Sequence, residues 1–200
     1  MIMITVVITV AVAQEKRYGI ERVILKKNSV VEMGGMKQNI TSIQYIDDYG
    51  IKESTESVIN MAGQSLSVFS MMKDGYAYSA NMTAKQGTKI NLSSMMDDFK
   101  TVNYLNITDD VKKKYQIEEK GNEQFFGKDC KRYDLTVSVQ GQSMKVNLWV
   151  WQGLALKSFI TVAGSTITEE VTEIQEGATI AKEKFELPEG INFTDATPQM

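Results

Sequence analysis

The sequence contains no histidine, one cysteine and two prolines among its 200 residues. The lack of histidine excludes every catalytic triad and metal site that needs an imidazole. The single cysteine, Cys130, excludes an internal disulfide and a thiolate metal cluster within this chain. Because a nucleophilic thiolate needs a base, usually histidine, we interpret Cys130 as a small half-buried side chain.

Several motifs and charge patterns are also missing. There is no P-loop and no Gly-x-Gly-x-x-Gly motif, so nucleotide binding has no support. The formal net charge is −3, which argues against a nucleic-acid partner. Adjacent acidic pairs recur, but neighbours on a strand point to opposite faces, and none has the spacing of a calcium loop. We therefore predict no metal and no cofactor. A hydrolase built on two distant carboxylates is a third hypothesis for the function, weaker than the two binding hypotheses given at the end of this subsection.

The first thirteen residues form an apolar run that ends in Ala11-Val12-Ala13. The run is shorter than the ~20 residues that a membrane-spanning helix needs, and its end fits the small-x-small pattern of a signal-peptide cleavage site. The alternative is a buried first strand, since isoleucine, threonine and valine favour strands. We predict a signal peptide over residues 1–13, a mature chain that begins near Gln14, and secretion to the periplasm.

Beyond this segment the dominant hydrophobic period is two, which is typical of strands. Gly34-Gly35 and Asp74-Gly75 each separate two such runs and predict hairpins, and the second hairpin pairs Met71 with Tyr78. After residue 116, short glycine-containing turns divide the chain into a meander of antiparallel strands.

In mid-chain the period changes to that of a helix over residues 92–99, and Thr108 predicts the cap of a second short helix. The predicted fold class is therefore α+β. It consists of a large curved antiparallel sheet, or incomplete barrel, with a short helical insert covering its concave face. One domain spans residues 14–193, and residues 194–200 form a tail.

The strand that carries both tryptophans has two different faces. Met144, Val146, Leu148 and Val150 alternate with Lys145, Asn147, Trp149 and Trp151. We expect the aliphatic face to be buried and the tryptophans to lie on the wetter face. There they either pack across strands, with Phe159 on the next strand, or dock a partner.

Four stretches, YIDDYGIKES, GKDCKRY, WVWQGLALKS and FELPEGI, follow one another over most of the mature chain. With them the chain resembles a family of uncharacterised secreted Bacteroidota proteins, which look similar in fold to the outer-membrane lipoprotein carrier LolA. The resemblance implies an incomplete β-barrel closed by helices, whose apolar concave face holds acyl chains. The chain departs from the carriers in entering a strand soon after Gln14, where carriers begin with a helix. No carrier binding residue can be matched to a position here.

The leading hypothesis is therefore a periplasmic, non-enzymatic, monomeric protein that binds lipid or a lipidated protein and contacts the membrane peripherally. The alternative is an envelope interaction or sensory module that docks a protein on Trp149, Trp151 and Phe159. For the carrier we expect methionine-rich elements to line the cavity, because methionine adapts to irregular apolar ligands. The candidates are Phe69, Met71, Tyr78 and Met82 on the hairpin, Met95, Met96 and Phe99 on the helical lid, and Leu148 and Val150 on the floor. If the interior is filled, the same residues form an ordinary core.

Overall fold

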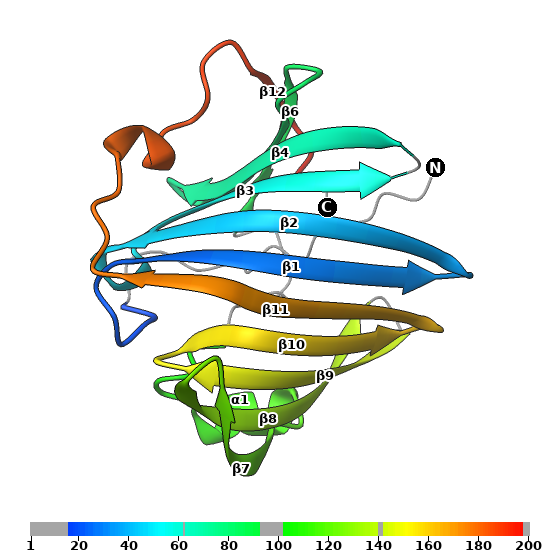
Figure 1. The fold of residues 1–200 in the computed structure, drawn as a ribbon, viewed down its shortest axis with the longest axis vertical. Helices are drawn as coiled ribbons and strands as arrows, with labels where there is room; N and C mark the ends of the chain where they lie inside the picture. Colours follow the sequence, from blue (N-terminus) through cyan, green and yellow to red (C-terminus); the bar gives the residue numbers. More distant parts are fainter. Residues whose placement is uncertain (1–15, 62, 93–101, 140–141, 198–200) are drawn as a thin grey trace.

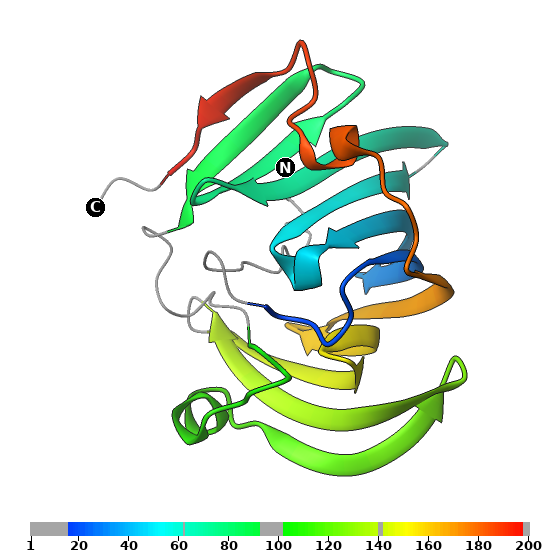
Figure 2. The ribbon, with the colours of Figure 1, turned by 90° about the vertical axis from the view of Figure 1, so that its left-hand side faces the viewer.

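The described residues fold into one twelve-stranded sheet that is strongly curved and does not close (Figures 1 and 2). The structure is a computed structural model that describes residues 16–61, 63–92, 102–139 and 142–197. The strand order is β12-β6-β5-β4-β3-β2-β1-β11-β10-β9-β8-β7. Neighbouring strands are antiparallel, except that β12 runs parallel to β6. The strands are β1 (Val23–Met33), β2 (Met36–Asp47), β3 (Lys52–Met61), β4 (Gln64–Lys73), β5 (Tyr76–Asn81), β6 (Gln86–Asn91), β7 (Glu118–Phe125), β8 (Lys128–Val139), β9 (Gln142–Trp151), β10 (Leu154–Val162), β11 (Ser165–Glu176) and β12 (Asn192–Asp195).

Helix contributes little to the described chain, so the expected α+β class is only weakly supported. The helical elements are α1 (Asp109–Lys114) and the 3-10 turns η1 (Asp48–Gly50) and η4 (Lys182–Phe185). The predicted cap of α1 is confirmed, because the Thr108 hydroxyl accepts a hydrogen bond from the Val111 amide at 3.4 Å. None of the described helices has the length and apolar character needed to cross a membrane.

Both predicted hairpins are confirmed, and so is the register predicted for the second. Met33 pairs with Met36 around Gly34-Gly35, and Met71 pairs with Tyr78 around Asp74-Gly75. The predicted meander is confirmed as β8 to β11. Strand β12 crosses the expected boundary between the domain and its tail at residue 193.

Three predicted segments fall wholly or largely outside the described residues. They are the signal peptide, the first mid-chain helix and the lid residues Met95, Met96 and Phe99.

The curvature gives the sheet a concave and a convex face, and the two carry different segments (Figure 2). Residues 16–22 and 102–117 lie on the concave side, where Tyr18 and Tyr115 join buried clusters. The segment after β11 packs instead on the convex side of β4 and β5, over Phe69, Met71 and Ala80. Alternation from strand to strand then assigns each side chain to one face.

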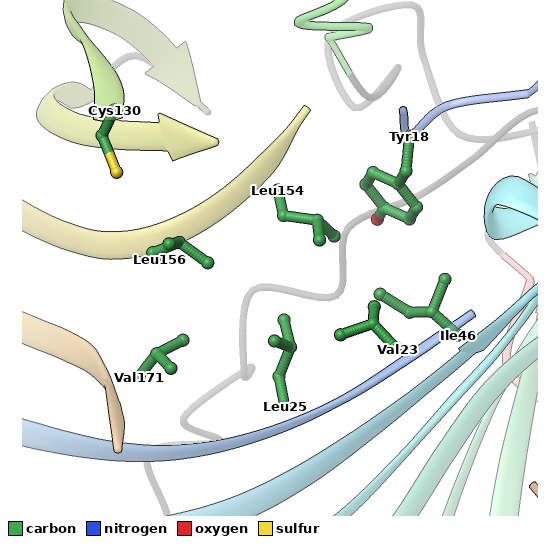
Figure 3. Packing of buried hydrophobic residues seen from close by; sticks show 8 residues of the cluster. All are labelled: Tyr18, Val23, Leu25, Ile46, Cys130, Leu154, Leu156 and Val171. Atoms are coloured by element: carbon green, nitrogen blue, oxygen red, sulfur yellow. The ribbon is translucent and has the colours of Figure 1, made fainter. Parts of the chain in front are cut away.

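The best-packed core lies on the concave side between β1–β2 and β10–β11 (Figure 3). Leu25, Ile46 and Leu156 are fully buried there, and Tyr18 enters the same cluster from the chain that precedes β1. Burial of this apolar surface, at about 25 cal/mol per Å², stabilises the curved arrangement of the strands.

Candidate functional site

A buried ion pair anchors the chain before β1 to one end of the concave face. Arg17 contacts Glu53 at 2.7 Å and donates from Nε to the Gly50 carbonyl at 3.1 Å. The Glu53 carboxylate also accepts hydrogen bonds from the Tyr18 hydroxyl at 3.1 Å and from the Gln44 amide at 2.5 Å. Burial, reinforced by the Glu53 charge, raises the pKa of Tyr18 well above its ordinary value. The interior carboxylate at this end therefore has a full set of partners.

Segment 102–117 covers the concave face of β8 to β10. Leu148 and Val150, the predicted cavity floor, are 7% and 5% exposed and pack with Tyr115 and Ile117. These two residues lie under the covering segment, and their role as the floor of a cavity stays a prediction. They take part in a packed hydrophobic cluster.

A row of aliphatic side chains crosses the concave face over seven neighbouring strands. In β9 to β11 its members belong to the cluster below segment 102–117 or pack against it, and Val31 in β1 is buried outside that cluster. In β2 to β4 its members, Ile40, Ile59 and Leu66, belong to none of the three buried clusters that the described residues form. The apolar row consists of Val146, Ile160, Ile167, Val31, Ile40, Ile59 and Leu66. Between β1 and β2 the row steps diagonally, because Val31 stands opposite Gln38 and Ile40 stands opposite Ser29. Six strand spacings of about 4.8 Å make it roughly 29 Å long, about the thickness of a bilayer's hydrocarbon core.

A stripe of small hydroxyl side chains runs beside the apolar row. It includes the cross-strand pairs Ser42–Ser57 and Ser70–Ser79. The stripe shifts by two residues from Ser29 to Ser42 and from Ser57 to Thr55. Among the described residues, the hydroxyls of Ser42 and Ser57 have no hydrogen-bond partner. The hydroxyl stripe consists of Ser158, Ser29, Ser42, Ser57, Thr55, Ser70, Ser79 and Thr88. The concave face therefore offers apolar and hydrogen-bonding surface side by side.

One ion pair sits within the hydroxyl stripe. Lys27 Nζ lies 3.0 Å from one carboxylate oxygen of Glu169, and the Ser29 hydroxyl donates to the other oxygen at 3.0 Å. The side chains are 12% and 32% exposed. Burial alone would raise the pKa of Glu169, but the Lys27 charge and the two hydrogen bonds outweigh it and hold the pKa below its ordinary value. The Glu169 carboxylate is therefore charged at neutral pH.

The hairpin candidates lie on the opposite face of the sheet from Leu148 and Val150. Alternation places Phe69 and Met71 on the convex face, where Phe185, Leu187 and Ile191 pack against their cluster. Tyr78 makes an edge contact with Phe193, with ring centroids 5.3 Å apart. The structure therefore does not bring the described candidates together in one cavity.

Two hollows involve hairpin candidates. Phe69 and Met82 line a hollow of about 600 Å³ on the convex face of β1 to β4, together with Ile43 and Val58. Met71 lines a second hollow of about 530 Å³ at the strand ends beside Arg17.

The tryptophans are half-buried and covered by cations. Arg132 and Lys157 lie 4.5 and 5.0 Å from the ring centroid of Trp149, and Lys128 lies 4.4 Å from that of Trp151. Each cation also pairs with a carboxylate, for example Lys157 with Glu170 at 2.8 Å.

Phe159 stands opposite Asn147 and is 37% exposed, so it is not the direct cross-strand neighbour of either tryptophan. This arrangement explains the tryptophans by packing and cation–π contact. The docking hypothesis stays a prediction.

Sequence reasoning missed the ion pair on the concave face. Lys27 and Glu169 are 142 positions apart, and only the pairing of β1 with β11 brings them together. In the part of the chain that the structure describes, no group of three or more histidine, cysteine or acidic side chains is arranged to hold a metal ion.

No protein-family model matches the chain, and no curated protein sequence matches it. Solved structures do match. An uncharacterised conserved protein from Thermus thermophilus has a TM-score of 0.51 at 8% identity, over 88% of this chain and 90% of that one. A putative outer membrane lipoprotein-sorting protein domain from Vibrio parahaemolyticus has a TM-score of 0.42 at 8% identity, over 82% and 89%. The lipoprotein LppX from Mycobacterium tuberculosis has a TM-score of 0.44 at 9% identity, over 82% and 91%. The Thermus match shows a shared fold, whereas TM-scores below 0.5 carry no functional conclusion.

Proposed function

We propose that this protein is a non-enzymatic binding protein of the periplasm that holds a lipid, or the acyl chain of a lipidated protein, on its concave face. The observation that carries the proposal is the open end of the apolar row. Ile59 and Leu66 are half-exposed on a concave surface, and no buried cluster of described residues includes them. Their apolar area is available to a ligand.

The rim beside this surface is also apolar. Met36 and Met61 are the most exposed large hydrophobic side chains among the described residues, at 68% and 60%. They lie at the tips of the β1–β2 and β3–β4 hairpins, on the face that carries Ile40 and Ile59. Flexible thioether side chains suit contact with irregular apolar ligands. We infer that an acyl chain enters between these hairpin tips.

The sequence resemblance to LolA-like proteins supports the same class of ligand. The interior carboxylates offer little for catalysis, because Glu53 and Glu169 are each held in an ion pair. Binding without a reaction step is therefore the simplest use of this face.

The proposal is tested by extracting the purified chain with organic solvent, identifying lipid by mass spectrometry, and titrating the delipidated protein with a fluorescent fatty acid. We expect saturable binding. Losing part of the burial of two aliphatic side chains, worth about 1.5–3 kcal/mol each when complete, predicts about tenfold weaker binding for Ile59→Ser/Leu66→Ser.

Val58→Ser is the matched control, because Val58 neighbours Ile59 on β3, faces the convex side and is 39% exposed. It should leave the affinity unchanged. Absence of both co-purified lipid and saturable binding contradicts the proposal, and so does an equal loss in the control.

A further inference from the structure

The Lys27–Glu169 pair has fewer side-chain partners than the other interior ion pair, although Arg17 Nη1 also lacks a hydrogen-bond partner among the described residues. Arg17 and Glu53 are clamped by Tyr18, Gln44 and Gly50. Lys27, by contrast, donates one hydrogen bond among the described residues, to Glu169, although an ammonium has three donors. The Glu169 oxygens each accept one hydrogen bond and have room for more.

The pair is also poorly explained by stability. Replacing a largely buried ion pair with apolar side chains of similar size is often neutral or stabilising, because the desolvation cost offsets the attraction. On the same face of β1, Lys27 lies between Leu25 and Ser29, and the apolar Val31 follows Ser29. A cation and an anion in this setting point to recognition of a charged ligand.

We propose that the Lys27–Glu169 pair and the neighbouring hydroxyls bind the zwitterionic head of an amphiphile, a phosphate ester that carries an ammonium group. The phosphate lies against the Lys27 ammonium and the Ser42 and Ser57 hydroxyls, and the ligand's ammonium lies against the Glu169 carboxylate. The acyl chain follows the apolar row toward Ile40 and Ile59.

Charge complementarity selects this head over an anionic one. A purely anionic head attracted by Lys27 is repelled by Glu169, whose carboxylate lies 3.0 Å from that ammonium. A zwitterion places an opposite charge beside each group. An uncharged head gains neither contact, although it keeps the apolar row.

This inference rests on the proposed function, and the test separates the two. The delipidated protein is titrated calorimetrically with lysophosphatidylethanolamine, lysophosphatidylglycerol and monoacylglycerol of one chain length, and with chain-free glycerophosphoethanolamine. We expect the zwitterionic lysolipid to bind about tenfold tighter than the other two lipids, the value of one charge-assisted hydrogen bond. The chain-free head should not bind measurably.

Lys27→Met/Glu169→Leu should reduce the preference to within about twofold while monoacylglycerol binding persists. Lys26→Met/Glu173→Leu is the matched control, because this pair joins the same two strands on the convex face at 2.7 Å. It should keep the preference. Lys27→Gln/Glu169→Gln repeats the test with polar side chains if the apolar variant fails to fold.

Equal binding of all three lipids by the wild type overturns this inference and leaves the proposed function standing. Binding of no amphiphile overturns both. Tight binding of glycerophosphoethanolamine alone overturns the assignment to an amphiphile and indicates a soluble phosphodiester ligand.

Discussion

Removal of Arg17 is expected to destabilise the whole fold. Arg17→Met leaves the Glu53 carboxylate buried without its cation and deprives the Gly50 carbonyl of its donor. Breaking a buried ion pair by removing one partner costs about 3–5 kcal/mol. Because Tyr18 and Gln44 still donate to Glu53, we expect a loss of about 3 kcal/mol, near the lower limit.

The double variant makes this prediction specific. Glu53→Met alone should also cost about 3 kcal/mol, whereas Arg17→Met/Glu53→Met should cost only about 2, because no unpaired charge remains buried. Urea unfolding at neutral pH, followed by tryptophan fluorescence, measures all four proteins. Additive losses of about 6 kcal/mol in the double variant would refute the coupling.

Three further outcomes are expected. Gly50→Ala should lower the free energy of unfolding by at least about 1–3 kcal/mol, because its φ is +92° and the new Cβ would lie 2.6 Å from the Tyr18 ring. Gly34→Ala should lower it less, because its φ is +56° and the new Cβ would meet nothing within 4 Å. Equal losses for the two variants in urea unfolding would count against the Tyr18 contact. Cys130 is fully buried, and burial raises the pKa of its thiol. A disulfide reagent should therefore modify the thiol slowly in the folded protein and rapidly in urea. Rapid labelling of the folded protein would show that the thiol is accessible. Because the pKa of Glu169 is lowered in the folded protein, its charge stabilises the fold above the ordinary carboxyl pKa of about 4.3, and this stabilisation is lost as pH falls through the folded pKa. The difference in unfolding free energy between wild type and Glu169→Gln should therefore shrink below about pH 4. A difference that does not change with pH would contradict the ion pair.

The hairpins and the meander could be predicted because they depend on neighbouring residues. Asp74-Gly75 fixes the register of β4 and β5, and alternation then places Phe69 and Met71 together. Which of the two faces becomes concave depends on the curvature of the whole sheet, and no local pattern encodes it. The hairpin candidates and Leu148 therefore lie on opposite faces, although alternation along β4, β5 and β9 is predicted correctly.

Long-range pairing limited the rest of the prediction. The contact of β1 with β11 joins the two halves of the sheet and creates the Lys27–Glu169 pair, but neither strand carries a sequence mark for the other. The parallel strand β12 is four residues long and follows Pro188, a residue type that commonly ends regular structure. Its Phe193 ring covers Gly87 and contacts Tyr78, a contact that only the folded chain reveals.

The most direct test of the central claim is an amide chemical-shift titration of the delipidated protein with lysophosphatidylethanolamine. The account predicts that the largest changes map to the concave face around Ile40, Ile59 and Leu66, which do not line the convex hollow. Changes centred instead on the convex hollow at Ile43 and Phe69, or no saturable change at any residue, would contradict it.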